Sequence, residues 1–512
     1  MQDRTFLALA LALTLVLAGC TGGSDRTTAS STIATTDGAT TESETTATTD
    51  GATTEPTGTE STGTESTTVA DPPEVKTENC RYGGEGDDEI VRESGACLPF
   101  DADTVYRRVL EMAGVDLDEG PTLRAIPARE TDRFEFGFND ATFGATMGIA
   151  PDGPPSVFVP GFAQPNQNPD GTVSPAVTMR YVGLWNDSAL QDDLDITYTA
   201  RDAEVTAAHE FLHVVQFYRG SQQRLARNLT SEGVNLADVE LAVVEGSATF
   251  FEAEYQREHM NESDAGRNRS AWANASAYAM AQLGPYVTGA DYARWYLNGS
   301  TENFEKLYDD PPVSMEQIIH KYEPDEELPK NLSVNGEVSS EWATPSFPET
   351  RGELFLRSAL RSGVNGSQAA RGAAGWGQDR VVAFQNTSFS PQGYYKYGWG
   401  WTIRFDDATE AAEFETIFQE WLEAKDLRES GVYGEDEHET FRLIEVSDET
   451  VVVLAGHEDF TTQATASGNT TQVVVEHTSR DQTGEDEDED EWTEEGDGNQ
   501  TVTAIWAGRS AA

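Results

Sequence analysis

The feature that most constrains the fold is the stretch 204–218 (EVTAAHEFLHVVQFY), which holds two histidines four positions apart. In an α-helix, residues i and i+4 lie one turn apart on the same face, so His209 and His213 can direct both imidazoles at one tetrahedral zinc ion. Glu210 lies beside them, in place to take a proton from a metal-bound water. The flanking residues are uncharged, as a buried helix requires. The stretch predicts a metal-binding helix; an ordinary helix with two half-buried histidines is the alternative.

A second apolar stretch, 243–255 (VVEGSATFFEAEY), follows downstream. An HExxH helix followed by E-G-x-A on another helix resembles the gluzincin class of zinc metallopeptidases, specifically its peptidase MA-like branch. The resemblance implies that Glu245 is the third protein ligand that a catalytic zinc needs. It also implies that Gly246 and Ala248 let the second helix approach the first, and that Glu252 supports a ligand from behind. A solvated Glu245 is the alternative, although its apolar neighbours make an unpaired charge there costly.

Three further blocks extend the resemblance: Ser314–Tyr322 (SMEQIIHKY), Gly375–Arg380 (GWGQDR) and Asp406–Phe414 (DDATEAAEF). They are similar to segments found in a poorly characterised family of archaeal surface lipoproteins. In the first block, His320 is a candidate to donate a hydrogen bond to an oxyanion, a role that zincins give to a His or Tyr. A capping or packing role for His320 is the alternative.

Other catalytic chemistries have no support in the sequence. It contains no G-x-S-x-G nucleophile motif and no phosphate-binding loop. The remaining histidines lack ligand spacing, and we interpret them as surface or structural residues: His259, His438, His457 and His477.

The charge of the chain limits its partners and indicates its environment. It carries 90 Asp and Glu against 34 Lys and Arg, a formal net charge of −56. Such a charge repels nucleic acid, so we expect no nucleic-acid partner. An acid-coated, lysine-poor surface stays hydrated in concentrated salt, where screening removes self-repulsion. We therefore expect a halophilic protein from a haloarchaeon; an acidic protein of an ordinary cell is the alternative.

The N-terminus predicts export and a lipid anchor. The apolar run Phe6–Ala18 is shorter than the ~20 residues that span a bilayer, but it suits a secretory signal. It ends in Leu-Ala-Gly-Cys, which resembles a lipobox. We expect residues 1–20 to be a lipoprotein signal for the general secretory route, with lipid on Cys20 holding the protein on the outer face of the cell membrane. A cleaved signal without lipid is the alternative. Residues 21–75, rich in Thr, Ser and Glu, predict a disordered stalk.

The other two cysteines, Cys80 and Cys97, form an even pair in an exported chain, which predicts a disulfide. Two free thiols are the alternative. Asn-x-Ser/Thr sequons are frequent along the chain and fit a glycoprotein.

The patterns along the chain predict an α+β fold. Residues 76–374 are expected to form a zincin-like domain whose active-site part is mostly helical. Residues 375–512 are expected to form a smaller α+β part, with an acidic loop at 481–498. Helical patterns fall at residues 101–114, 202–218, 238–257, 270–282, 292–297, 315–322, 353–360 and 407–425. Strand patterns fall at residues 156–159, 176–182, 380–384, 397–405, 440–445, 450–454, 471–476 and 501–507.

Two functions follow as expectations. The first is a membrane-anchored extracellular zinc metallopeptidase that hydrolyses peptide bonds of a peptide or protein substrate with a zinc-activated water. The second is a non-catalytic structural or binding lipoprotein, associated with the surface-layer glycoprotein, that keeps a zincin scaffold.

Overall fold

The computed structural model describes the folded body of the chain as a mixed α and β structure. The described residues are 91–92, 98–117, 119–125, 134–135, 143–150, 156–157, 160–168, 173–179, 191, 197–229, 235–261, 274–338, 342–344, 347–386 and 396–477. The predictions for Cys20, Cys80, Cys97, the stalk and the acidic loop fall outside these residues.

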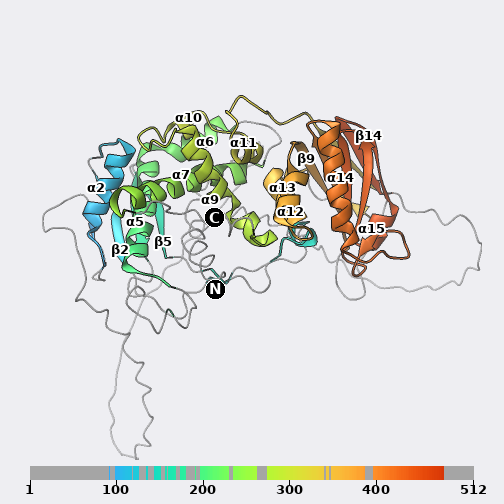
Figure 1. The fold of residues 1–512 in the computed structure, drawn as a ribbon, viewed down its shortest axis with the longest axis horizontal. Coiled ribbons are helices and arrows are strands. Elements are labelled where there is room, and N and C mark those ends of the chain that lie inside the picture. The colour runs from blue at the N-terminus through green and yellow to red at the C-terminus, as the bar shows by residue number, and fades with distance from the viewer. Residues whose placement is uncertain are drawn as a thin grey trace, which may run out of the picture.

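The first part of the fold combines a small sheet with a group of helices (Figure 1). The sheet has the order β1-β2-β6-β5, in which β1, β2 and β6 are parallel and β5 is antiparallel at one end. Its strands are β1 (Val91–Arg92), β2 (Thr122–Ala125), β5 (Gly161–Gln167) and β6 (Val173–Met179). A separate two-stranded pairing joins β3 (Phe134–Glu135) to β4 (Ser156–Val157).

The helices of this part are packed around one apolar core. They are α2 (Ala102–Ala113), α5 (Ala200–Arg219), α6 (Ser221–Asn228), α7 (Leu236–His259), α9 (Ala277–Tyr296), α10 (Lys306–Asp309) and α11 (Met315–His320). The prediction for α2 is confirmed together with its acidic cap, because the Asp101 side chain accepts the backbone N–H of Thr104 at 3.1 Å.

Helix α9 corrects the sequence analysis, which predicts two helices at 270–282 and 292–297. One continuous helix begins after Ser276 and runs through both the gap and Pro285. A proline inside a helix removes a backbone donor and normally ends or kinks it. Here Pro285 is buried and the helix packs along α7, α11 and α12, so tertiary burial outweighs the local preference.

The small residue Gly246 also has a different neighbour from the expected one. A Cβ at Gly246 would lie 2.5 Å from the backbone of Gly289, and a Cβ at Gly289 would lie 2.2 Å from the carbonyl oxygen of Ala242. Gly246 therefore lets α9 approach α7; we expected it to bring α7 and α5 together. The glycine pair explains how two long helices cross at close range.

The second part of the fold has three layers (Figure 1). A six-stranded sheet, in the order β11-β12-β13-β10-β9-β8, lies between a helical layer and a three-stranded sheet, in the order β14-β15-β7. The strands are β7 (Ser333–Val338), β8 (Trp342–Ala343), β9 (Trp376–Asn386), β10 (Tyr397–Phe405), β11 (Tyr433–Gly434), β12 (Thr440–Ser447), β13 (Thr450–Gly456), β14 (Ala464–Asn469) and β15 (Gln472–His477). β7 and β8 precede residue 375 but pair with strands that follow it.

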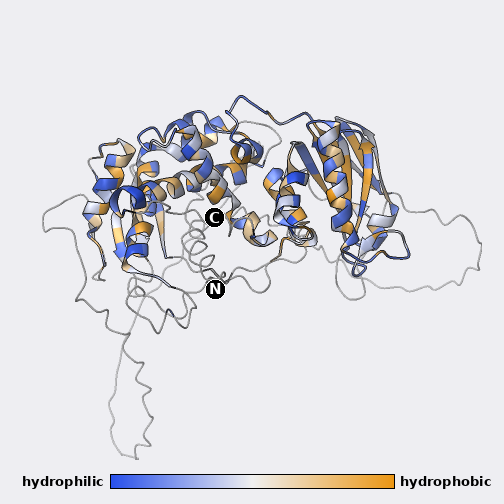
Figure 2. Ribbon diagram, in the orientation of Figure 1, coloured by the Kyte–Doolittle hydropathy of each residue, from blue (hydrophilic) through white to orange (hydrophobic). Residues whose placement is uncertain are grey.

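The helical layer of this part contains α12 (Glu353–Arg361), α13 (Gly366–Ala373) and α14 (Ala408–Glu423). The short helices α3 (Phe143–Thr146) and α15 (Glu458–Gln463) pack nearby. Helix α14 is amphipathic, as Figure 2 shows by the mixture of polar and apolar residues along it. Its apolar side, which includes Phe414, Phe418 and Trp421, is buried against the sheet and α13. Among the described helices, none is long and apolar enough to cross a membrane.

Candidate metal centre

Helix α5 places the two histidines of the HExxH motif. Thr199 caps its N-terminus in a reciprocal arrangement with Asp202, and Gly220 ends it in the left-handed conformation at φ 62°. Nearly all residues from Ala203 to Phe217 are buried. The helix is therefore fixed at both ends and along its length, which holds the two imidazoles rigidly in the core.

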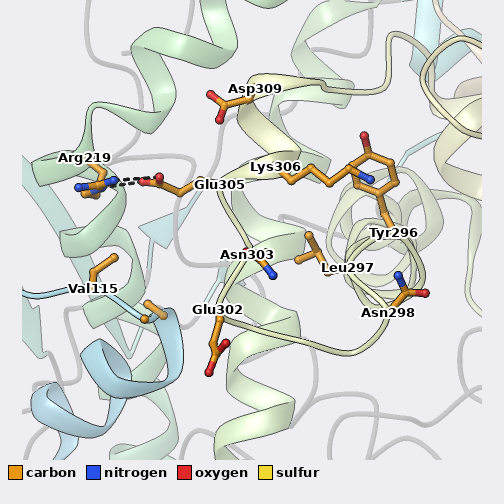
Figure 3. A pocket seen from close by; sticks show the side chains of 12 residues that line it. Val115, Arg219, Tyr296, Leu297, Asn298, Glu302, Asn303, Glu305, Lys306 and Asp309 are labelled. Carbon is orange, nitrogen blue, oxygen red and sulfur yellow. Dashed lines mark hydrogen bonds and ion pairs between the residues drawn. The ribbon is translucent and has the colours of Figure 1, made fainter.

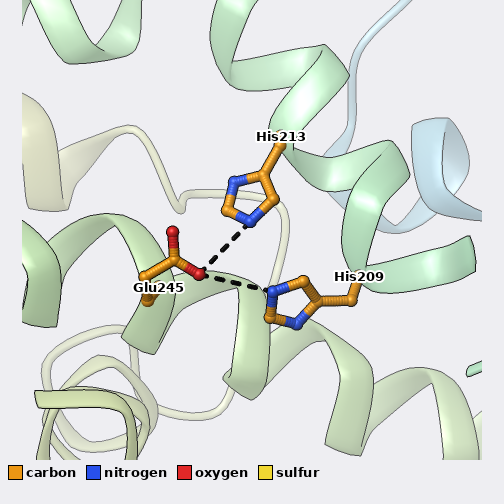
Figure 4. Close-up of side chains that lie close together, drawn as sticks. All are labelled: His209, His213 and Glu245. Carbon is orange, nitrogen blue, oxygen red and sulfur yellow. Dashed lines mark ion pairs between the residues drawn. The ribbon is translucent and has the colours of Figure 1, made fainter. Parts of the chain in front are cut away.

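Three side chains from α5 and α7 converge in this core (Figure 4). The Nε2 atoms of His209 and His213 each lie 3.4 Å from Oε2 of Glu245. The exposed fractions are 3% for His209 and 0% for the other two. One ligand atom from each residue lies within 4.8 Å of the others. Two imidazole nitrogens and one carboxylate oxygen are a donor set that suits Zn²⁺ with an open fourth position.

Several polar atoms at the centre have no hydrogen bond. The Nε2 atoms of both histidines are buried and have no hydrogen-bond partner. Leaving buried polar groups unsatisfied costs about 1–3 kcal/mol each. Burial raises the pKa of Glu245, but the neighbouring His213 and His209 lower it by more, so that it lies at about 2. An ionised carboxylate facing two ring nitrogens fits a bound divalent metal.

The outer nitrogen of each imidazole also has a neighbour. Nδ1 of His209 lies 3.3 Å from Oε2 of Glu252, the residue expected to support a ligand. Nδ1 of His213 lies 2.8 Å from Oε1 of Gln216. The contact of His213 is a hydrogen bond, which fixes the orientation and tautomer of a metal-binding histidine, whereas that of His209 is a charge contact without hydrogen-bond geometry.

Glu210 lies next to the ligands but faces the sheet. It is completely buried, and the backbone N–H of Ala163 in β5 donates towards its carboxylate. Burial raises its pKa to about 6, against the opposing effect of His209 and His213. The end strand β5 passes close by, since a Cβ at Gly161 would lie 3.4 Å from Cγ of Glu210. A carboxylate with a pKa near neutrality is suited to accept and return a proton.

The structure does not bring His320 into this group. Its Nε2 lies 3.0 Å from Oε1 of Glu353, a fully buried carboxylate that also accepts from Arg357 at 2.8 Å. Its ring stacks on Tyr322. These contacts connect α11 to α12 and give His320 a packing function.

Another histidine pair lies near an acid in the second part of the fold. Glu437, His438 and His457 come within ligand distance of one another. However, Nδ1 of His457 accepts the backbone N–H of Asp459 at 3.1 Å and caps α15. Burial lowers the pKa of His457, so the ring is neutral and its proton is on Nε2. Neither nitrogen of His457 is then free to bind a metal, and this histidine is the cap of α15.

A cavity of about 520 Å³ opens elsewhere, between the ends of α2, α5 and α9 (Figure 3). Its main cations already have partners: Arg219 donates to Glu305 at 2.7 Å, and Nζ of Lys306 lies 3.5 Å from the ring centre of Tyr296. The cavity therefore offers no converging set of free polar groups comparable to the centre at His209.

Two contributors to the centre were missed in the sequence. Gln216 follows His213 by three positions, and this helical spacing on one face could have identified it. Strand β5 (GFAQPNQ) has proline, asparagine and glycine in place of a strand pattern, so no local signal could have placed it beside Glu210.

A known protein family matches only a stretch in the second part of the fold. Residues 345–466 match the model of a family described as a domain of unknown function (DUF8575). The matched stretch contains α12 to α14 and strands β9 to β13, and it ends within β14. It includes none of the three residues that converge in the metal centre. No curated protein and no solved structure matches the chain.

Proposed function

We propose that this protein is a zinc metallopeptidase-like protein of the gluzincin type. The observation that carries the proposal is the convergence of His209, His213 and Glu245 in the core, with Glu210 on the next position of the same helix. A bound Zn²⁺ would polarise the scissile carbonyl and make a coordinated water more acidic.

Glu210 acts as the general base and then as the general acid. One of its carboxylate oxygens takes the proton from the attacking water and later returns it to the leaving amide nitrogen. The pKa of about 6 keeps most of this carboxylate ionised at neutral pH, while its acid form remains accessible. No side chain among the described residues hydrogen-bonds to this carboxylate, which leaves it available for the transfer.

The sheet next to the centre supports a peptide as the substrate. β5 pairs with β6 on one side and is the terminal strand in the order of its sheet. An extended peptide can add to such an edge through main-chain hydrogen bonds. Because β5 passes Glu210, a peptide aligned along it lies beside the catalytic carboxylate.

We also propose that the protein acts outside the cell, held to the membrane by lipid on Cys20 and raised from it by the stalk. The Cys20→Ser variant should appear in the medium or accumulate as unprocessed precursor. A normally processed variant that stays in the membrane fraction would contradict the anchor.

One observation favours the second candidate, a non-catalytic scaffold. His320, the candidate oxyanion donor, is held by Glu353 and lies outside the group of three ligands. In that case the metal would stabilise the fold without turnover.

Metal analysis in high salt, combined with a peptide-library assay, tests the function. We expect stoichiometric zinc in the purified protein and hydrolysis that stops when a chelator removes the metal. Zinc without any hydrolysis of denatured protein or peptides would favour the scaffold. A protein that takes up no zinc at all would exclude both forms of the proposal.

A further inference from the structure

Gln216 lies on the outer side of His213 and is completely buried. Its Oε1 is 2.8 Å from Nδ1 of His213, and its Nε2 lies 3.2 Å from the carbonyl oxygen of Val244 and 3.1 Å from Oγ of Ser247. Every polar atom of this side chain therefore has a partner. The amide spans from α5, which carries the histidines, to α7, which carries Glu245.

The surroundings determine which way the amide points. The carbonyl of Val244 can only accept, so the atom facing it must be the NH₂ group of Gln216. The carbonyl oxygen of the amide then faces Nδ1 of His213, which must carry the hydrogen. In the neutral form that binds a metal, the imidazole has one hydrogen, so Nε2 presents its lone pair on the side of Glu245. This is the tautomer that a metal ligand requires.

The amide is itself anchored. Ser247 Oγ lies 2.9 Å from the carbonyl oxygen of Val244 and 2.9 Å from the hydroxyl of Tyr308 in α10. Ser247 and Tyr308 are both fully buried. The hydrogen-bonded series His213–Gln216–Ser247–Tyr308 thus joins three helices behind one ligand, and its member on α7 lies two positions from Glu245.

We propose that Gln216 is a positioning residue that holds His213 in its metal-binding tautomer and orientation and couples it to the helix that carries Glu245. The inference rests on the proposed metal site. It implies that the two histidine ligands have different partners at their outer nitrogens. His209 is backed by the carboxylate of Glu252, whereas His213 is backed by a neutral amide. The neutral partner fixes the ring without adding another negative charge to a core that already holds Glu210 and Glu245.

The experiment compares Gln216→Met with Gln216→Glu. Methionine has nearly the same length but can neither accept from Nδ1 nor donate to Val244. The dissociation constant for Zn²⁺, measured by chelator competition on the full chain in high salt, should rise ~10–100-fold. Glutamate keeps an acceptor for Nδ1 but loses the NH₂ group that donates to Val244 and Ser247, so Gln216→Glu should recover part of this loss. The melting temperature of each variant without metal shows whether the substitution affects folding independently of zinc binding.

Gln317 provides a matched control. It is also fully buried, but its amide bonds only to backbone groups, accepting from Val313 N–H at 2.6 Å and donating to the carbonyl oxygens of Pro324 and Glu326 at 3.1 and 2.6 Å. Gln317→Met should lower the melting temperature and leave the zinc dissociation constant unchanged.

Three results would overturn the inference. Equal changes in zinc affinity for Gln216→Met and Gln317→Met would reduce Gln216 to a packing residue, as would a Gln216→Glu variant no better than Gln216→Met. Unchanged affinity in Gln216→Met would do the same. In these cases the wild-type protein still binds zinc and the proposed function stands. A wild-type protein that binds no zinc would instead remove the metal site and this inference together.

Discussion

Two completely buried carboxylates, one in each part of the fold, have opposite surroundings. Asp379 in β9 accepts the indole N–H groups of Trp376 and Trp401 at 3.0 and 2.8 Å, and the backbone N–H of Gly352 at 2.8 Å. Glu245 in α7 directs an oxygen at two imidazole nitrogens that themselves lack hydrogen-bond partners. The first carboxylate is enclosed by donors, whereas the second faces potential metal ligands.

The difference separates an acid that holds elements of the fold together from one that we propose binds a metal. α12 has no capping side chain of its own, and Asp379 reaches from β9 to accept the N–H groups at its start. Asp379, the aspartate of the GWGQDR block, therefore connects strand β9 of the sheet to the start of helix α12. The Glu245 oxygen instead lies 3.4 Å from two imidazole nitrogens, an arrangement in which a cation placed between the three atoms would be bound by all of them. Burial alone does not distinguish the two; the identity of the neighbouring atoms does.

The strongest test of this comparison is removal of a ligand. Alanine at Glu245, His209 or His213 should weaken zinc binding by more than the ~10–100-fold typical of residues behind the ligands, because two protein ligands hold zinc poorly. The fraction of protein that carries zinc should therefore fall sharply. Metal content after gel filtration in high salt measures the loss. Stoichiometric zinc in Glu245→Ala would move the third ligand to another acid, with Glu252 the nearest candidate.

Glu210→Gln should separate proton transfer from metal binding. Glutamine is almost isosteric and Glu210 is not among the three converging ligands, so zinc should remain. Peptidase activity should fall by at least the ~10² typical of a lost general base. Activity is measured at equal zinc content. An unchanged rate in this variant would require another group to take the proton.

Asp379→Ala should show the opposite pattern from Glu245→Ala. It leaves buried indole and backbone donors without an acceptor, which should lower the free energy of unfolding by about 2–3 kcal/mol. Zinc content should not change. Asp407→Ala, which removes an exposed cap of α14, is the comparison and should lower the free energy of unfolding by less. Loss of zinc from Asp379→Ala without loss of stability would mean that the two regions are not independent.

The same comparison shows how far the sequence could be interpreted. Helix α5 and strand β10 were predicted because their patterns are local: periodic apolar residues with caps, and alternation of bulky residues. The spacing in α5 also made His209 and His213 candidate ligands. The function of Asp379 could not be predicted, since its donors come from β9, β10 and the start of α12. The continuity of α9 was missed for the same physical reason, because distant packing decides it.

The smallest expected effect concerns Glu252, which lies between the two classes of carboxylate. Its side chain is 12% exposed, one oxygen faces Nδ1 of His209 at 3.3 Å, and the other accepts from Gln256 at 3.2 Å. Because a glutamine keeps an oxygen for the imidazole N–H and loses only the charge, Glu252→Gln should weaken zinc binding by at most ~10-fold. Glu258→Gln, at an exposed position of the same helix paired with Arg257, should have no effect in the same chelator competition. A loss as large as that of Glu245→Ala would place Glu252 among the ligands, and unchanged affinity would leave the orientation of His209 to the packing of α5 alone.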